Sequence, residues 1–172
     1  MCGQNWRVMD AASPYGFRRA VGADKPLIDG WLGQPHVAAW WGPDASFDVG
    51  KLADPRQDVR IVTLDGRDIG YMQDYDPHGW EVHPFAGLAA GARGTDQFIG
   101  PAALVGQGHG PRFIAARMAA LFAAGAPVLG TDPHPDNARA IAAYRKAGFT
   151  VAGPAADGPW GRYLPMQALA PV

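Results

Sequence analysis

Three glycines at alternate positions stand directly before a helix-like segment in "VGQGHGPRFIAARMAALF", residues 105–122. Glycine adopts backbone conformations that are closed to other residues, and it lets another molecule approach the main chain closely. Pro111 follows Gly106, Gly108 and Gly110, and proline is favoured at the first position of a helix. Because amides at a helix N-terminus bind anions, the segment predicts a turn that holds a phosphate-sized group where a helix begins at Pro111.

Two common phosphate motifs do not account for this turn. The segment lacks the Gly-Lys-Ser/Thr of a P-loop, and its glycines do not have the spacing of the dinucleotide fingerprint. The sequence therefore predicts a phosphate-bearing ligand of another kind.

The composition excludes several classes of protein. Of the 172 residues, 48% are hydrophobic and 18% are charged, and the net charge is -1. This balance is typical of a folded domain and disfavours nucleic-acid or membrane-surface binding, which requires an excess of basic residues. No apolar run reaches the ~20 residues that span a bilayer. We therefore expect no nucleic-acid partner and no membrane.

Cysteine usage and the first residues indicate the compartment and the redox chemistry. Cys2 is the single cysteine, which excludes an intrachain disulfide and a cysteine zinc cluster. The first residues show no basic segment followed by a long apolar stretch, so we identify no signal peptide. A cytoplasmic protein without a metal site is expected.

The chain predicts one α/β domain over residues 14–172, with an α+β mixed sheet, behind a flexible tail of residues 1–13. Alternating apolar residues on either side of Asp65-Gly66 indicate an antiparallel hairpin. Residues 76–94 have no period and are expected to form a long loop, which in a compact domain is usually functional or disordered. The other expected elements are a strand at 15–21, two short helices between 24 and 41, a strand from 95, a helix over 112–124, a strand at 127–133, a helix from 136 to 148, and a closing hairpin over 149–169.

The segment "DNARAIAAYRKAGF" predicts a helix that carries polar groups on one face. Asp136 or Asn137 is the N-cap and Gly148 is the C-cap. Asn137 and Tyr144 stand about two turns apart, so they lie on the same face. Buried tyrosines usually find a hydrogen-bond partner, so this residue alone is compatible with a purely structural role.

Together, "GQGHGPRF" and "NARAIAAYRKAGF" resemble the GCN5-related N-acetyltransferases (GNAT), whose fold is a central twisted mixed β-sheet flanked by helices. The resemblance implies acetyl-coenzyme A (acetyl-CoA) as cofactor. It implies that the glycine turn binds the pyrophosphate, that Asn137 contacts the pantetheine arm and that Tyr144 faces the thiol. This sequence departs from the family pattern in having Val105 where Gln or Arg is common, and Pro111 removes one amide donor. The implied cofactor-binding residues are Val105, Gln107, Gly108, His109, Gly110, Arg112, Asn137 and Tyr144.

Further motifs in matching order narrow the resemblance. "WLGQPHVAAWWG", "IGYMQDY", "RGTDQFIG" and "TDPHPDN" are similar to the aminoglycoside 6'-N-acetyltransferase branch. This similarity implies acetyl transfer to the 6'-amino group of an aminoglycoside, and with it a role in antibiotic resistance. Two alternatives stay open. One is an acyltransferase for another amine, such as a hydroxylated lysine or siderophore precursor, and the other is a non-catalytic acyl-CoA-binding module.

Amine acetylation requires a group that removes the ammonium proton and a group that protonates the departing thiolate. Asp96 is the first candidate base and Asp132 the second, although either could instead cap a turn or a helix. Tyr144 takes the thiol role, and an amide around Val105 polarises the carbonyl. The residues expected to bind the acceptor are Trp40, Trp41, Gln73, Asp74, Asp76, Asp96 and Asp132.

The loop before "RGTDQF" carries little negative charge for a polycationic acceptor. Glu81 is the one acidic residue in "GWEVHPFAGLAAGARG". His78 and His83 are expected on the loop surface, without a metal. The sequence leaves open the acceptor, the choice between Asp96 and Asp132 as base, and whether the chain acts as a monomer or a homodimer.

Overall fold

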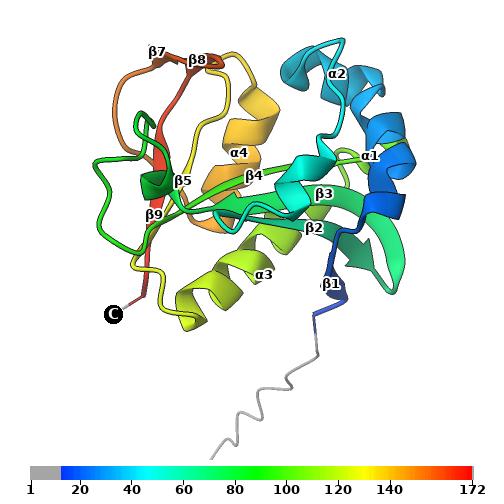
Figure 1. Cartoon of the computed structure of the whole chain (residues 1–172), viewed down its shortest axis with the longest axis horizontal. Coiled ribbons are helices and arrows are strands. Elements are labelled where there is room, and N and C mark those ends of the chain that lie inside the picture. The colour runs from blue at the N-terminus through cyan, green and yellow to red at the C-terminus, as the bar shows by residue number, and fades with distance from the viewer. Residues whose placement is uncertain (1–12, 172) are drawn as a thin grey trace, which may run out of the picture.

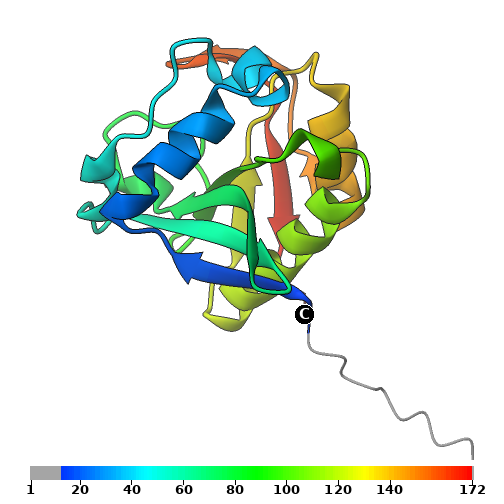
Figure 2. The same cartoon turned by 90° about the vertical axis from the view of Figure 1, so that its right-hand side faces the viewer.

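A computed structural model describes residues 13–171 (Figures 1 and 2). Within that range, seven strands form one mixed sheet in the order β1-β2-β3-β4-β5-β9-β6, and β7 and β8 form a separate hairpin. The strands are β1 (Tyr15–Arg19), β2 (Gln57–Leu64), β3 (Arg67–Tyr75), β4 (Arg93–Ile99), β5 (Val128–Thr131), β6 (Thr150–Val151), β7 (Ala156–Gly158), β8 (Gly161–Tyr163) and β9 (Met166–Leu169). The helices are α1 (Lys25–Leu32), α2 (Pro35–Trp41), α3 (His109–Ala123) and α4 (Ala138–Ala147), with short 3-10 turns η1 (Gly22–Asp24), η2 (Val49–Leu52), η3 (Pro77–Gly79) and η4 (Ala102–Leu104).

The β2–β3 hairpin has the predicted turn. Asp65 and Gly66 both adopt positive φ angles, of 48° and 80°, which two-residue hairpin turns of this type require. The two strands pair antiparallel from Gln57↔Tyr75 to Leu64↔Arg67. This hairpin fixes which residues of β3 face each side of the sheet.

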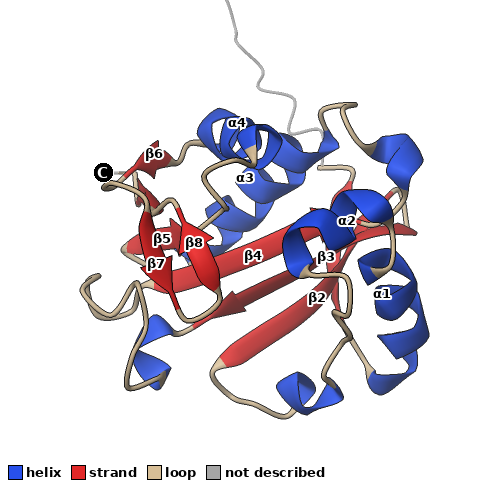
Figure 3. Cartoon of the chain, turned by 90° about the horizontal axis from the view of Figure 1, so that it is seen from above, coloured by secondary structure: helices blue, strands red, loops and turns tan. Residues whose placement is uncertain are grey.

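Helices cover both faces of the sheet (Figure 3). On one face α3 and α4 pack on a core that includes Met72 and Phe113, and on the other α1 and α2 pack on a core that includes Ile61 and Tyr71. Neighbouring residues of a strand point to opposite faces. Adjacent positions of β3 and β4 therefore have different surroundings.

The sheet opens between β4 and β5. Their parallel pairing covers two residue pairs, Arg93↔Leu129 and Gly94↔Gly130, whereas β3 pairs with β4 as far as Ile99. Beyond Gly94 the two strands therefore separate. The α4 helix follows β5, and side chains of β4 and α4 meet in this opening.

Both helices predicted after the glycine turn are present, with one difference at the start of α3. Gly108 is the N-cap, so α3 begins at His109 and Pro111 occupies its third position, not its first. Proline is accommodated there because the first four amides of a helix have no intrahelical acceptor. At α4, the side chain of Asn137 accepts a hydrogen bond from the Ala140 amide, and Gly148 ends the helix in the left-handed region with φ of 117°.

The closing segment is more elaborate than the predicted hairpin. β6 pairs antiparallel with β9, and the residues between them form the additional β7–β8 hairpin. This hairpin lies at the top left of Figure 1. Of the expected N-terminal tail, residues 1–12 lie outside the described residues, and β1 begins at Tyr15.

Candidate active site

The glycine turn exposes a row of backbone amides. Gly106 and Gly108 adopt φ angles of 80° and 81°, and a Cβ atom added at either position would meet no atom within 4 Å. Within the described chain, the N–H groups of Gly106, Gln107, Gly108 and His109 donate to no backbone acceptor. Four consecutive N–H groups, including that of Gln107, are thus free at the N-terminus of α3, an arrangement that binds anions.

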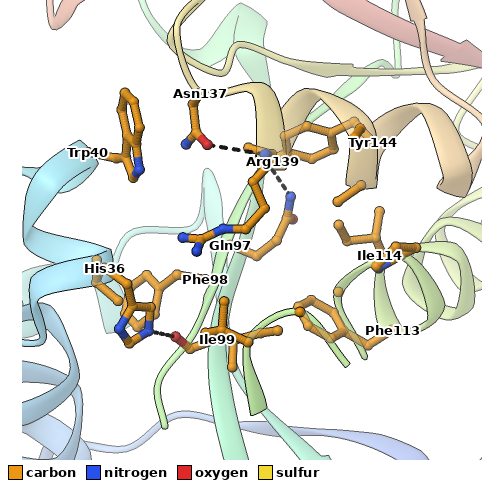
Figure 4. A pocket seen from close by; sticks show the side chains of 18 of the residues that line it. His36, Trp40, Gln97, Phe98, Ile99, Phe113, Ile114, Asn137, Arg139 and Tyr144 are labelled. Atoms are coloured by element: carbon orange, nitrogen blue, oxygen red, sulfur yellow. Dashed lines mark hydrogen bonds between the residues drawn. The ribbon is translucent and has the colours of Figure 1, made fainter. Parts of the chain in front are cut away.

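A cleft of about 270 Å³ runs from this turn to α4 and α2, and we call it the glycine-turn cleft. Figure 4 shows Gln97 and Arg139 extending into it between Trp40 and Tyr144. Two cations therefore border the cleft, Arg139 and Lys146 of α4. Of the expected cofactor-binding residues, Val105, Gly108, Gly110, Asn137 and Tyr144 line it.

Three expected residues of the turn direct their side chains elsewhere. The amide group of Gln107 donates to the Ala103 carbonyl. Nδ1 of His109 lies 2.9 Å from the hydroxyl of Tyr15, and Arg112 is exposed outside the cleft lining. At Gln107 and His109 only the backbone is available to an anion in the turn.

Tyr144 of α4 lines the glycine-turn cleft. Tyr144 is buried, and its oxygen accepts a hydrogen bond of 2.5 Å from the side chain of Gln97. Burial raises the pKa of this hydroxyl well above its ordinary value. Tyr144 therefore carries its proton at neutral pH and can donate it.

A second cleft, of about 570 Å³, opens on the other side of Tyr144, and we call it the carboxylate cleft. It shares Trp40, Trp41, Gln97, Asn137, Ala140 and Tyr144 with the first cleft. Trp40 is 42% exposed and its ring lies 5.7 Å from that of His134. Trp41 packs edge-on against the core rings of Tyr71 and Phe98.

Asp96 lies in this cleft, and a chain of hydrogen bonds from β3 and η2 leads to its carboxyl group. It pairs across β3–β4 with Gln73, whose side chain donates a 2.8 Å hydrogen bond to it. The oxygen of Gln73 in turn accepts from the Tyr71 hydroxyl and from Lys51. Burial raises the pKa of Asp96, while Gln73 and the Lys51 charge oppose that shift.

Asp132 follows the last residue of β5 and faces the same cleft. Its carboxyl group accepts a 2.8 Å hydrogen bond from the indole N–H of Trp160. Burial and the neighbouring charge of Asp96 raise the pKa of Asp132 to about 8. At neutral pH Asp132 therefore favours its protonated form. Since Asn137 caps α4, Asp132 is not needed as its cap.

Two expected acceptor-binding residues lie outside the carboxylate cleft. Asp74 follows Gln73 in β3 and so points to the opposite face, where Arg93 and Arg117 bind its buried carboxylate. Asp76 accepts from the amide of His78 as the N-cap of η3, and its side chain is 47% exposed. Because side chains alternate along a strand, Asp74 lies on the opposite face of β3 from Gln73, and it does not line the carboxylate cleft with it.

The structure adds residues that the sequence analysis did not select. The carboxylate cleft also contains Lys51, Tyr75, Trp80, His83 and Trp160. Gln97 stands inside the motif "RGTDQF", one position after Asp96, and Arg139 and Lys146 stand inside the α4 motif. Because Gln97, Arg139 and Lys146 lie within or beside recognised motifs, the sequence could have indicated them as site residues. Lys51 and Trp160 come from distant segments, and no motif marks them.

Two other features of the described chain bear on function. Within residues 13–171, no group of three His, Cys, Asp or Glu side chains is arranged to hold a metal ion. The same residues include no helix long and apolar enough to cross a membrane.

Two joined clefts of different character suit a group transfer. One ends in free amides and cations that bind phosphate, and the other contains a carboxyl pair that can hold an ammonium. The neutral Tyr144 hydroxyl lies where they meet. This geometry fits a phosphate-bearing acyl donor on one side and an amine on the other.

Comparisons with known proteins agree with the geometry. Residues 20–156 match the family model described as "Acetyltransferase (GNAT) domain". The aminoglycoside N(6')-acetyltransferase type 1 of Klebsiella pneumoniae is 34% identical over 156 residues, covering 79% of this chain and 75% of that protein. A kanamycin resistance protein of Rhizobium radiobacter is 42% identical over 74 residues, which is 40% of this chain and 67% of that one.

Solved structures give the same result. The complex of the aminoglycoside acetyltransferase AAC(6')-Ib with coenzyme A and kanamycin has a TM-score of 0.81 and 30% identity, covering 90% of this chain and 94% of that one. Its complex with paromomycin and acetyl-CoA has the same TM-score and identity, with 90% and 93% covered. The chain belongs to the GNAT family of acetyltransferases, and it is an acyltransferase.

Proposed function

We propose that this enzyme transfers the acetyl group of acetyl-CoA to the 6'-amino group of an aminoglycoside. The observation that carries the proposal is the meeting of the two clefts at Tyr144, with Asp96 and Asp132 on the acceptor side. The AAC(6')-Ib structures with kanamycin and with paromomycin support the choice of acceptor. A cytoplasmic location, where acetyl-CoA is made, is part of the proposal, as is action by a single chain, alone or within a homodimer.

The glycine-turn cleft is suited to coenzyme A. Its diphosphate would lie on the free amides from Gly106 to His109, where the partial positive charge of the α3 N-terminus favours an anion. Arg139 and Lys146 would add positive charge along the cleft, and Asn137 would contact the pantetheine arm. Bound in this way, acetyl-CoA supplies an activated thioester close to Tyr144.

Asp96 is proposed as the base that accepts the proton of the acceptor's ammonium. The hydrogen bond from Gln73 and the charge of Lys51 favour its ionised form, whereas Asp132 favours its protonated form. Tyr144 would donate its proton to the sulfur that leaves. Holding the donor and the acceptor in contact replaces an encounter in solution and contributes ~7 kcal/mol or more to lowering the barrier.

One experiment separates the candidate functions. The purified protein is incubated with acetyl-CoA and kanamycin, ribostamycin or hydroxylysine, and the release of free thiol is measured together with the mass of the product. We expect turnover with the aminoglycosides and a mass increase of one acetyl group on them. Turnover with hydroxylysine alone would instead favour the siderophore-type acceptor.

A binding measurement tests the cofactor independently of the acceptor. Titration with coenzyme A is expected to saturate, and Tyr144→Phe is expected to bind it while losing most thiol release. Saturable binding without thiol release by the wild-type protein across all amines would favour a non-catalytic module. Absence of saturable binding would refute the proposal for the glycine turn.

A further inference from the structure

Trp160 lies on a part of the fold that the sequence analysis did not anticipate. It stands between β7 and β8, in the hairpin inserted between β6 and β9. Its side chain is 57% exposed, although it is a large aromatic group. Yet Trp160 also lines the carboxylate cleft, so one side of the ring faces the cleft and the rest faces solvent.

Two contacts hold the indole in this position. Its N–H donates to Oδ2 of Asp132 at 2.8 Å, and its ring lies 5.4 Å from that of His83. His83 belongs to the long loop between β3 and β4 and also contacts Tyr75 and Trp80. The hairpin and the loop therefore meet through Trp160 and His83 above the carboxylate cleft.

The hydrogen bond to Asp132 has a chemical consequence. An aspartate carboxyl group is attached to the main chain through two rotatable bonds, so it needs a fixed partner to keep one orientation, and an N–H donor stabilises its ionised form. The indole N–H fixes one oxygen of Asp132. The carboxyl group thereby stays in the position from which it interacts with Asp96.

We propose that Trp160 is the positioning and specificity-determining residue of the acceptor site. Its indole N–H orients Asp132 toward Asp96, and its ring encloses the acceptor against the loop that carries His83. The kinetic part of this inference rests on the proposed acetyl transfer, whereas the structural part does not require turnover.

Several titratable groups surround Asp132, and any change of pH acts on all of them. They come from β3, β4, α4, η2, the long loop and the segment after β5: Tyr75, Asp96, Tyr144, Lys51, His83 and His134. The indole N–H is the contact that can be removed without changing any of these charges. Trp160→Phe therefore isolates the hydrogen bond, and Trp160→Ala removes the ring as well.

The kinetic test compares pH profiles of kcat/KM with kanamycin as acceptor. Without the indole donor, Asp132 is no longer held where its hydrogen bond lowers the pKa of Asp96, so the acid limb, which reports Asp96 as the base, is expected to move to higher pH in Trp160→Phe. A displacement of one unit corresponds to about a tenfold loss of kcat/KM below the limb. Trp160→Ala is expected to raise the KM for kanamycin further, and Arg162→Ala, on the same hairpin, serves as the matched control. Superimposable profiles of wild type and Trp160→Phe would overturn the positioning role, and an unchanged KM in Trp160→Ala would overturn the enclosing role.

A second measurement decides the inference even if kanamycin is not an acceptor. In 15N-labelled protein, the Trp160 indole N–H resonance is identified by its absence in Trp160→Phe and followed with pH in the absence of acceptor. We expect it to titrate with the Asp132 carboxyl group near pH 8, and to lose this transition in Asp132→Asn. A resonance that shows, at any pH, no transition that Asp132→Asn removes would refute the hydrogen bond, whereas failure of thiol release alone would refute only the proposed acetyl transfer.

Discussion

The side chain of Gln97 donates a 2.5 Å hydrogen bond to the hydroxyl of Tyr144, and this contact joins β4 to α4 where the sheet opens. Gln97 is itself held by the hydroxyl of Thr95, which donates to its oxygen at 2.8 Å. The amide orientation of Gln97 is therefore fixed, with its N–H₂ group toward Tyr144. The tyrosine oxygen receives this bond and keeps its own proton free for a ligand in either cleft.

Tyr144→Phe tests this arrangement directly. Loss of a general acid lowers a rate by about 100-fold or more, so we expect kcat to fall by that amount. The affinity for coenzyme A should remain close to that of wild type, since the glycine turn is untouched. Thiol-release kinetics and a coenzyme A titration measure the two effects. A kcat near the wild-type value would show that the thiolate leaves without this proton.

Gly108→Ala tests the turn at the start of α3. Gly108 has a φ of 81°, where a side chain costs about 1–2 kcal/mol, and the added methyl group would project into the open space that the free amides face. We expect lower thermal stability and a much weaker affinity for coenzyme A. Gly87→Ala is the control, because Gly87 also has open space around it but no positive φ. Coenzyme A binding as tight as in wild type would exclude the turn as the diphosphate site.

The sequence predicts those parts of the site that are determined by short-range patterns. The glycine turn, the Asn137 cap, the face of α4 that carries Tyr144 and the β2–β3 hairpin all depend on residues close together in the chain. Asp96 and Asp132 were also selected, because each stands inside a recognisable motif at the end or middle of a strand. The GNAT resemblance then supplied the fold as a whole.

The features of the site that could not be predicted from the sequence depend on contacts between distant segments of the chain. Lys51 reaches Gln73 from η2 across 22 positions, and Trp160 reaches Asp132 across 28. The β7–β8 hairpin is short and rich in glycine, so its strands carry almost no periodic signal. The placement of Asp74 away from the cleft has a different reason, since its neighbour Gln73 faces the cleft and side chains alternate along the strand.

Asp74 is expected to be structural. Its side chain is 2% exposed and binds both Arg93 and Arg117, so Asp74→Asn leaves two guanidinium groups near an uncharged partner. Breaking a buried ion pair from one side costs about 3–5 kcal/mol, which urea denaturation would measure. The KM for the acceptor should not change in the folded fraction.

Asp76→Asn is the matched control for that change. Asparagine also caps a helix start, and the side chain of Asp76 is half exposed. The free energy of unfolding of Asp76→Asn should therefore stay within about 0.5 kcal/mol of the wild-type value. An acceptor KM that rises in Asp74→Asn but not in Asp76→Asn would contradict the purely structural role.

Thr131→Val is expected to raise stability and lower activity. The hydroxyl of Thr131 is buried and, within the described residues, forms no hydrogen bond of good geometry, although it lies near enough to the Tyr144 hydroxyl to lower the pKa of that group. A buried hydroxyl without a well-formed hydrogen bond costs about 1–3 kcal/mol. Valine has the same shape without that cost. Thr131 lines the carboxylate cleft together with Tyr144. Because its hydroxyl lowers the stability of the protein, we expect that the hydroxyl contacts a bound ligand.

Thr95→Val provides the comparison for Thr131. Thr95 is equally buried, but its hydroxyl donates to Gln97, so the same substitution should lower the melting temperature there. If Thr131→Val also lowers it, the Thr131 hydroxyl has a partner in solution. An unchanged kcat in a stabilised Thr131→Val would mean that this hydroxyl does not take part in the reaction.

Asp132 should make the stability of the protein fall as pH rises. Its pKa is about 8 in the folded protein and has an ordinary value of 3.8, so between these values the folded state binds more protons than the unfolded state. The free energy of unfolding therefore decreases with rising pH across this window, by at most about 1.4 kcal/mol per unit for one group.

Asp132→Asn removes this proton uptake while an oxygen remains for the Trp160 indole. Relative to wild type, the variant should gain stability as pH rises from 5 to 9, because the wild-type carboxyl group becomes charged next to Asp96 and the amide does not. Urea denaturation at pH 5, 7 and 9 measures the difference, and Asp157→Asn on the exposed hairpin is the control. If the curves for Asp132→Asn and wild type run parallel over this range, Asp132 is already ionised at pH 5, and the protonated form inferred for it at neutral pH is absent.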